Sequence, residues 1–440
     1  MANHNTLIKG TLILTLAGFL TRIIGFFYRI FLSQTIGAEG MGIYQLIFPI
    51  HTLCFALTVS GIQTAISRFV AAKCAVKDEN GARNIFLIGT GMCVILSITV
   101  SFFLYRYAAY FADAFLDELR CSSLLRLMAW SIPFGTFHSC VNAYYYARSQ
   151  TGIPAVSQLL EQISRVLASY IFYLIILSHN QEPTPIMAVF GILGGEVVSM
   201  LFSSIMITWD FKKYSASLIP LEQPWHNLQE ILILSIPLTC NRVLLTLLQS
   251  AEAVLIPGRL RLYGLSTSDA LSIYGILTGM SLPLILFPST ITNSISVMLL
   301  PAVAEDQARE NHASIRRTIL LTIRYCLILG FCSTAFFFLF GNWLGLFLFK
   351  SVYAGAFIKT LSFICPFLYL TTTLTSILNG LGKTGLCFLQ NTIGLSLRIL
   401  FVLLAIPRFG ITGYLWGLLA GELIISLLCL IFLRQYIFTK

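Results

Sequence analysis

The residues whose chemistry stands out are two arginines inside an apolar stretch near the start of the chain. Arg22 and Arg29 lie in the stretch 8–33, which contains no acidic residue. At 100° per residue, one side of a helix would carry Gly18, Arg22, Gly25 and Arg29, so that small residues alternate with cations. The two arginines would stand about 10 Å apart along the axis, a spacing that could bracket a diphosphate. The alternatives are that Arg29 snorkels to the interface, or that both pair with an acid elsewhere.

Two further arginines lie in later apolar stretches. Arg68 is near the end of the second stretch. There it either reaches a substrate cavity between the spans or marks the cytoplasmic boundary. Arg242 is a few turns into the seventh, where it is either a second anion contact or a structural partner of Glu252 or another acid. A charge in the middle of a bilayer costs about 2.5–3.5 kcal/mol and therefore needs water or a partner. We predict that the substrate-binding residues are Arg22, Arg29, Arg68 and Arg242.

Other charged residues in the apolar stretches could serve as ion pairs or as coupling sites. Glu161 and Arg165 are spaced i,i+4, which favours a pair on one helix face. Glu196 and Glu422 each follow a glycine and have no acid-base partner nearby in the sequence, so they either bind a coupling cation or proton or pair with arginines of other helices. The full set of possible coupling or structural residues is Glu161, Arg165, Glu196, Glu252, Arg398 and Glu422.

The elements that must position these residues are membrane-spanning helices. Of the 440 residues, 57% are hydrophobic and 10% are charged, which is too little polar surface for a soluble domain of this size. Apolar stretches of about 20 residues, long enough to cross the hydrocarbon core as helices, recur along the chain. They lack the period-two alternation of a membrane β-barrel, so the predicted fold class is all-α. About twelve spans are predicted, near residues 8–33, 42–70, 85–110, 124–147, 155–177, 186–209, 230–256, 271–299, 318–341, 355–380, 387–406 and 411–433.

Short similarities at a nearly constant offset predict an internal duplication. Ile43-Tyr44 returns as Ile273-Tyr274, and Gly195-Glu196 returns as Gly421-Glu422, at offsets between 226 and 233. The predicted division gives two six-helix lobes, 1–215 and 216–440. Because six is even, the lobes would be parallel repeats around a central cavity, an arrangement typical of transporters that work by alternating access.

The net charge of +10 does not come from one basic patch, which argues against a nucleic-acid partner. The basic residues gather at even-numbered connections and near the C-terminus, so the positive-inside rule predicts both termini in the cytoplasm. The eleven cysteines include no CxxC pair, and the six histidines form no metal-binding motif. We therefore expect no catalytic residue, no metal, no cofactor and no enzyme activity.

Several stretches resemble the stage V sporulation protein B group of the multidrug, oligosaccharidyl-lipid and polysaccharide (MOP) exporter superfamily. The resemblance covers nearly the whole chain and is carried by stretches 21–29, 36–44, 61–68, 155–162, 300–305 and 378–383. It implies a flippase for polyprenyl-diphosphate-linked sugars, similar to lipid II flippases, with arginines of the first span in a cationic cavity. Thr21-Arg22 matches the Ser-Arg pair of those flippases, whereas Tyr28 stands where they tend to carry another arginine.

The leading interpretation is thus a membrane flippase or exporter of a lipid-linked saccharide, such as a peptidoglycan precursor or a polysaccharide repeat unit. One alternative is a cation-coupled multidrug exporter of the same superfamily, which should carry a carboxylate in its first span. Another is a non-transporting scaffold for cell-wall synthesis. The expected setting is a bacterial plasma membrane, and the expected partners are an anionic lipid-linked saccharide, membrane lipids and cell-wall synthesis enzymes, with a monomer as the default.

Overall fold

The computed structural model describes residues 4–213 and 224–438, and these residues form helices and connecting turns without a β-strand. Burying the backbone polar groups of such an apolar chain in lipid requires them to bond within each segment, which only a helix achieves for a single segment. The predicted all-α class is therefore confirmed, and the chain is a multi-pass helical membrane protein.

The chain packs into two compact units. Two long helices, α1 (His4–Leu46) and α10 (Pro224–Leu262), contribute to both units. The first unit takes residues up to Tyr28 and Leu46–Ser250, and the second takes Arg29–Gln45 and the residues from Ala251 onward. These packing boundaries differ from the lobes 1–215 and 216–440, and the duplication inferred from the sequence stays a prediction.

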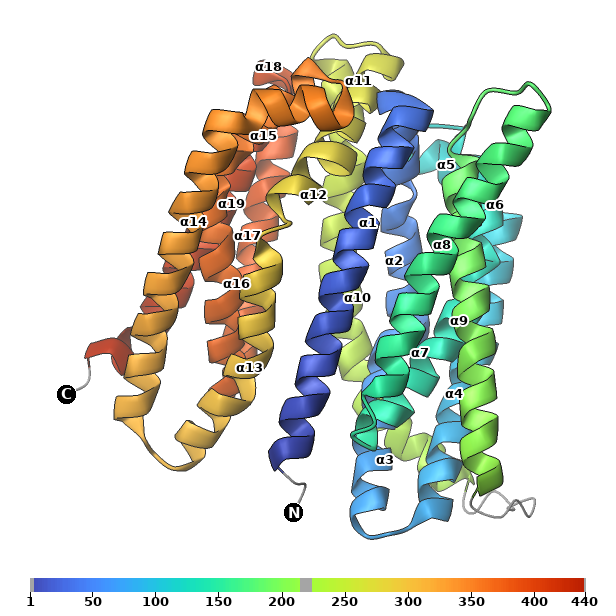
Figure 1. Cartoon of the computed structure of the whole chain (residues 1–440), viewed down its shortest axis with the longest axis vertical. Helices are drawn as coiled ribbons and strands as arrows, with labels where there is room; N and C mark the ends of the chain where they lie inside the picture. Colours follow the sequence, from blue (N-terminus) through green and yellow to red (C-terminus); the bar gives the residue numbers. More distant parts are fainter. Residues whose placement is uncertain (1–3, 214–223, 439–440) are drawn as a thin grey trace. The chain divides into compact units, whose positions relative to one another are not determined.

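Besides its parts of α1 and α10, the first unit contains eight α-helices and a π-helical segment, drawn from blue to green in Figure 1. They are α2 (Phe48–Phe55), η1 (Ala56–Ser60), α3 (Gly61–Ala75), α4 (Glu79–Arg106), α5 (Ala108–Ala114), α6 (Cys121–Ala129), α7 (Ser131–Ala147), α8 (Gly152–Ser178) and α9 (Ile186–Lys213). Helix α9 packs along both α8 and α7, and α4 packs against α3 and α7. A buried cluster that includes Ile66, Phe86, Tyr144 and Ile231 forms the apolar core between α3, α4, α7 and α10.

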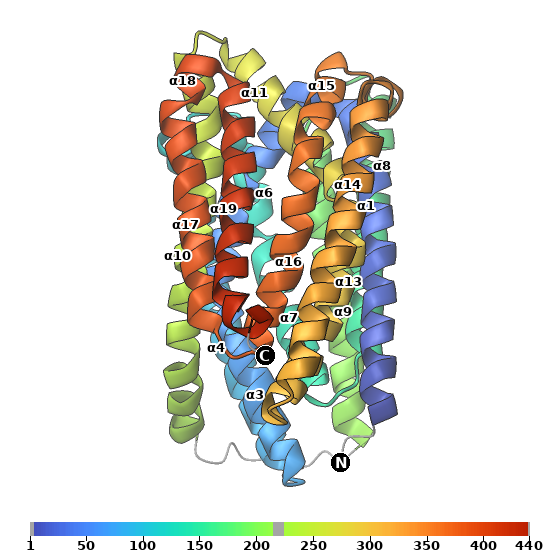
Figure 2. The same ribbon diagram turned by 90° about the vertical axis from the view of Figure 1, so that its left-hand side faces the viewer.

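The second unit is built in a similar way, from yellow to red in Figures 1 and 2. Its elements are α11 (Thr267–Gly275), the π-helical η2 (Ile276–Ser281), α12 (Leu282–Ile285), α13 (Ser289–Ala308), α14 (His312–Phe349), α15 (Val352–Leu361), the 3₁₀ turn η3 (Ser362–Ile364), α16 (Cys365–Gly380), α17 (Thr384–Leu404), α18 (Ile406–Phe409) and α19 (Ile411–Phe438). Figure 2 shows α17 running beside α19 and α14 beside α16.

Ten segments of the described residues are long and apolar enough to cross a membrane. One of them, Leu12–Ala75, covers two of the twelve predicted spans because α1 to α3 follow one another almost without interruption. The predicted span 124–147 is not among the ten, since a turn at Trp130 divides it between the short helices α6 and α7. The remaining nine segments correspond one to one with the other nine predicted spans.

The turn between α3 and α4 shows how a short connection is held outside the apolar stretches. Asp78 caps α4, because its carboxylate accepts a 2.8 Å hydrogen bond from the Gly81 N–H. Lys73 of α3 forms a 3.2 Å ion pair with the same carboxylate. The Gly81 N–H and, to a smaller extent, Lys73 lower the pKa of Asp78.

Candidate functional site

The first half of α1 lies along α8, and this contact orients the arginine-bearing face. A Cβ built on Gly10 would lie 2.9 Å from the Thr151 hydroxyl oxygen, and one built on Gly25 would lie 3.3 Å from Nε2 of Gln162. A Cβ built on Gly18, by contrast, meets no atom within 4 Å. The space beside α1 is thus open at Gly18, whereas α8 takes it up at Gly25.

Tyr28, which the sequence resemblance marks as a departure from lipid II flippases, is buried. Its hydroxyl lies 2.6 Å from the hydroxyl of Ser169 on α8. Because Ser169 already donates its hydrogen to the carbonyl of Met187 at 3.1 Å, Tyr28 is the donor in this bond. Tyr28 therefore fastens α1 to α8.

The predicted substrate-binding arginines are divided between the two units. Arg22, Arg68 and Arg242 belong to the first unit and have exposed side chains, whereas Arg29 is half-buried and belongs to the second. Arg22 and Arg242 lie near the middles of the long helices α1 and α10. Among the described residues, Arg68 and Arg242 form no ion pair with a carboxylate.

The part of α1 that carries Arg29 continues to Leu46 with a kink at Gly37, whose φ of 71° suits a residue without a Cβ. Beyond the kink, Glu39 accepts a 2.7 Å hydrogen bond from Ser268 at the start of α11. A Cβ on Gly42 would lie 2.0 Å from the carbonyl oxygen of Leu271, so α1 and α11 meet backbone to backbone. This contact anchors the second half of α1 in the second unit.

A buried network of charged side chains occupies the first unit between α7, α8 and α9. Glu161 and Arg165 of α8 form an ion pair, as their i,i+4 spacing predicts. Glu196 of α9 lies 2.9 Å from Nε2 of His138 on α7. His138 belongs to no metal-binding motif in the sequence, and the one signal that marks it there is a polar ring in an apolar stretch.

The second unit holds a related network between α10, α17 and α19. Arg398 donates a 2.8 Å hydrogen bond to Glu252, and Tyr414 donates one of 2.7 Å to the same carboxylate oxygen. The suggested pairing of Glu252 with Arg242 is therefore not formed, because Arg398 and Tyr414 hold Glu252. Glu422 interacts electrostatically with Arg398. Its Oε2 is buried and has no hydrogen-bond partner in the described part of the chain.

The two networks share a local arrangement that the sequence offset anticipates. A Cβ built on Gly195 would lie 3.3 Å from Cβ of Arg165, and one built on Gly421 would lie 2.9 Å from Cγ of Arg398. In each unit, the glycine before the glutamate lets the last helix approach the arginine of a neighbouring helix closely. This correspondence supports the predicted duplication.

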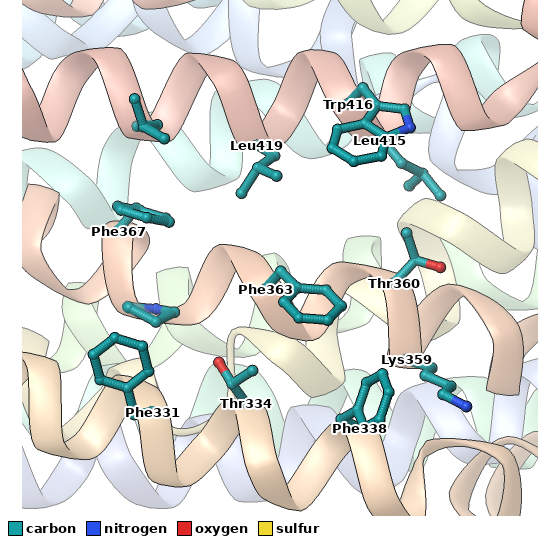
Figure 3. Close-up of a pocket in the computed structure, with 12 residues that line it drawn as sticks. Phe331, Thr334, Phe338, Lys359, Thr360, Phe363, Phe367, Leu415, Trp416 and Leu419 are labelled. Carbon is teal, nitrogen blue, oxygen red and sulfur yellow. The ribbon is translucent and has the colours of Figure 1, made fainter.

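An apolar cavity of about 520 Å³ opens in the second unit between α14, α15, α16 and α19 (Figure 3). Aromatic rings line much of it, among them Phe331, Phe338, Phe363 and Trp416. Lys359 lines the cavity beside Phe338, at the lower right of Figure 3, and its Nζ is 4.6 Å from the ring centroid of Phe338. The lining suits hydrocarbon rather than a charged group.

Comparisons with known proteins agree with this architecture. Residues 7–307 match the family model described as polysaccharide biosynthesis protein. Stage V sporulation protein B of Bacillus subtilis (strain 168) is 28% identical over 429 residues, covering 96% of this chain and 82% of that protein. Lipid II flippase MurJ of the same organism is 27% identical over 169 residues, which cover 37% of this chain and 31% of MurJ.

The fold is also that of solved transporters. A multidrug resistance MATE family transporter of the MOP superfamily, solved in an inward-facing conformation, superposes with a TM-score of 0.71 at 15% identity, covering 95% of this chain and 94% of that one. The resemblance proposed from the sequence is confirmed at the level of family and fold. The chain therefore belongs to the polysaccharide biosynthesis protein family and has the fold of the solved MOP superfamily transporters.

Proposed function

We propose that this transporter moves a polyprenyl-diphosphate-linked saccharide across the bacterial plasma membrane by alternating access, with both termini in the cytoplasm. The observation that carries the proposal is the pair of exposed arginines, Arg22 and Arg242, near the middles of two membrane-length helices. A permanent cation at such a depth needs water or an anion beside it. The family match and the partial similarity to lipid II flippase MurJ favour a lipid-linked saccharide as that anion.

Arginine suits this substrate for a chemical reason. Its guanidinium is planar, always protonated, and able to give two parallel hydrogen bonds to a phosphate group. In this proposal Arg22 and Arg242 hold the diphosphate, and Arg29 and Arg68 act as further contacts as the lipid enters or leaves. The saccharide occupies the wet space beside the arginines, and the polyprenyl chain remains in hydrocarbon.

The multidrug alternative is less well supported, although the similar solved structures include multidrug transporters. Stretch 8–33 has arginines and no carboxylate, and the acid of α1, Glu39, lies beyond the Gly37 kink and is bonded to Ser268. Arginines would repel a cationic drug. A scaffold that transports nothing would have no use for exposed charges within its membrane helices.

A binding measurement tests the proposal. Purified protein in lipid nanodiscs is titrated with a radiolabelled polyprenyl-diphosphate-linked disaccharide. A hydrogen bond to a charged group is worth about 1.5–3 kcal/mol, so Arg22→Gln and Arg242→Gln should each raise the Kd about tenfold or more.

The matched control is Arg309→Gln, because Arg309 is an exposed arginine already paired with Glu305 at the end of α13. Its Kd should equal that of the wild type. Unchanged binding in both Arg22→Gln and Arg242→Gln would rule out the arginines as the anion site.

A further inference from the structure

The network around His138 has the composition of a site that exchanges a proton. His138 and Glu196 are 8% and 5% exposed, and they meet at 2.9 Å between α7 and α9. Glu161 and Arg165 of α8 interact electrostatically with His138, and Glu196 interacts with His51 of α2 as well as with Arg165. The charged and titratable side chains that face the His138–Glu196 pair from α2 and α8 are therefore His51, Glu161 and Arg165.

The charges of this network balance only when it holds one added proton. Two carboxylates, Glu161 and Glu196, stand against one guanidinium, Arg165, so the network is singly negative while both histidines are neutral. A buried net charge in a membrane protein is costly, and one proton on the His138–Glu196 pair removes it. Histidine is the side chain whose ordinary titration falls between about pH 5 and 8, which makes it suited to gain and lose that proton.

A proton accounts for the His138–Glu196 contact without a metal ion. Donor atoms of His138, Glu161 and Glu196 all lie within 4.8 Å of one another, so a cation would be conceivable on composition alone. Nε2 of His138 and Oε2 of Glu196 lie 2.9 Å apart, an ion-pair distance, although Oε2 accepts no hydrogen bond from the described residues. A protonated imidazole attracts the carboxylate at this distance, so the contact requires no metal ion.

The other ring nitrogen of His138 is prepared for either protonation state. Its Nδ1 lies 3.2 Å from the hydroxyl of Ser199, which in turn lies 2.7 Å from the hydroxyl of Ser157. A hydroxyl can donate or accept, so this buried pair can donate to a neutral imidazole and accept from a protonated one. The side-chain amide of Asn142 also lies beside this nitrogen, with its Nδ2 at 3.4 Å, and a turn of the amide presents Oδ1 to a protonated ring.

The network opens toward α8, the helix that α1 contacts. The side chains of Arg165 and Glu161 are 22% and 19% exposed, so protein does not fully enclose this end. Nε2 of Gln162, the neighbour of Glu161, lies 3.3 Å from the place that a Cβ on Gly25 of α1 would take. Gly25 is one helical turn from Arg22. A change of charge in the network is therefore placed to alter the packing of the helix that carries the arginine.

We propose that the His138–Glu196 pair is a proton-binding site that couples a proton to the transport cycle through α8 and α1. The proton site stands on the geometry of the first unit alone, whereas its link to anion movement rests on the proposed function.

Nuclear magnetic resonance of protein labelled with ¹⁵N in its histidines tests the site without any substrate. His138→Gln identifies the His138 signal, which should titrate between about pH 5 and 9. Glu196→Gln removes the partner charge and should move the midpoint by one pH unit or more. His179→Gln is the matched control, because His179 is an exposed histidine at the end of α8, and it should leave the His138 titration unchanged.

Two results would overturn the proton site. One is a His138 signal that does not change across that pH range, which would make the pair a fixed structural contact. The other is a signal that responds to stoichiometric Na⁺ or Zn²⁺ instead of pH, which would make the cluster a metal site.

The coupling is tested separately, in vesicles that contain the polyprenyl-diphosphate-linked disaccharide and carry an imposed pH gradient. The gradient should change the transport rate of the wild type and of His179→Gln several-fold, and it should leave Glu196→Gln unaffected. Equal responses of Glu196→Gln and wild type would overturn the coupling. Absence of transport in all three proteins, with a normal His138 titration, would instead count against the proposed substrate.

Discussion

At the scale of residues, sequence spacing predicts contacts within a helix but not contacts between helices. The Glu161–Arg165 pair follows from i,i+4 spacing alone, and the structure contains it. The partners of Glu252 and Glu196 lie on other helices, 146 residues away for Arg398 and on α7 for His138. Such partners depend on helix packing, which hydrophobic periodicity does not specify.

One stability prediction belongs to this scale. Glu252→Gln leaves the Arg398 guanidinium without its charged partner, and breaking a buried pair costs about 3 kcal/mol or more. We expect a loss of that size in unfolding measured in mixed detergent micelles. Glu305→Gln removes an exposed pair on α13 and should cost about 0.5 kcal/mol or less. Equal losses in the two variants would show that the Glu252 pair is not the structural contact described here.

At the scale of elements, apolar length predicted the helices well because lipid leaves the backbone few alternatives. It does not record where a helix is interrupted, as at Trp130, because hydropathy reports apolar length and not a break in the helix. The predicted lobes likewise do not include the contribution of α1 and α10 to both units. That contribution depends on which neighbours each half of a long helix packs against.

The cap of α4 gives a prediction for one element. Asp78→Ala removes the hydrogen bond to the Gly81 N–H, and we expect a loss of about 1 kcal/mol, seen as faster hydrogen exchange in the first turn of α4. Since the pKa of Asp78 is lowered in the folded protein, its contribution is present above the ordinary aspartate pKa of about 3.9. It is lost as the pH falls below that value through the lowered pKa. Asp78→Asn should keep much of the cap at every pH. Hydrogen exchange in Asp78→Asn as fast as in Asp78→Ala would contradict the capping role.

At the scale of the whole molecule, composition and the repeated patterns pointed to a helical membrane transporter, and the resemblance to the stage V sporulation protein B group pointed to the MOP superfamily. The comparisons confirm the family and the fold. The substrate is a matter of a few side chains on that common fold, which is why fold alone does not supply it. Permanent cations near the middles of α1 and α10 are the feature that favours an anionic lipid over a cationic drug.

The most direct test is transbilayer movement in vesicles made with the purified protein. Wild type should move a fluorescent polyprenyl-diphosphate-linked saccharide, and it should not move a lipid of the same length that carries the saccharide without phosphate. The double variant Arg22→Gln/Arg242→Gln should lose at least nine-tenths of the rate, a loss of about 1.4 kcal/mol or more in transition-state stabilisation, while Arg309→Gln keeps it. Equal movement of both lipids, or equal rates in wild type and the double variant, would contradict the account.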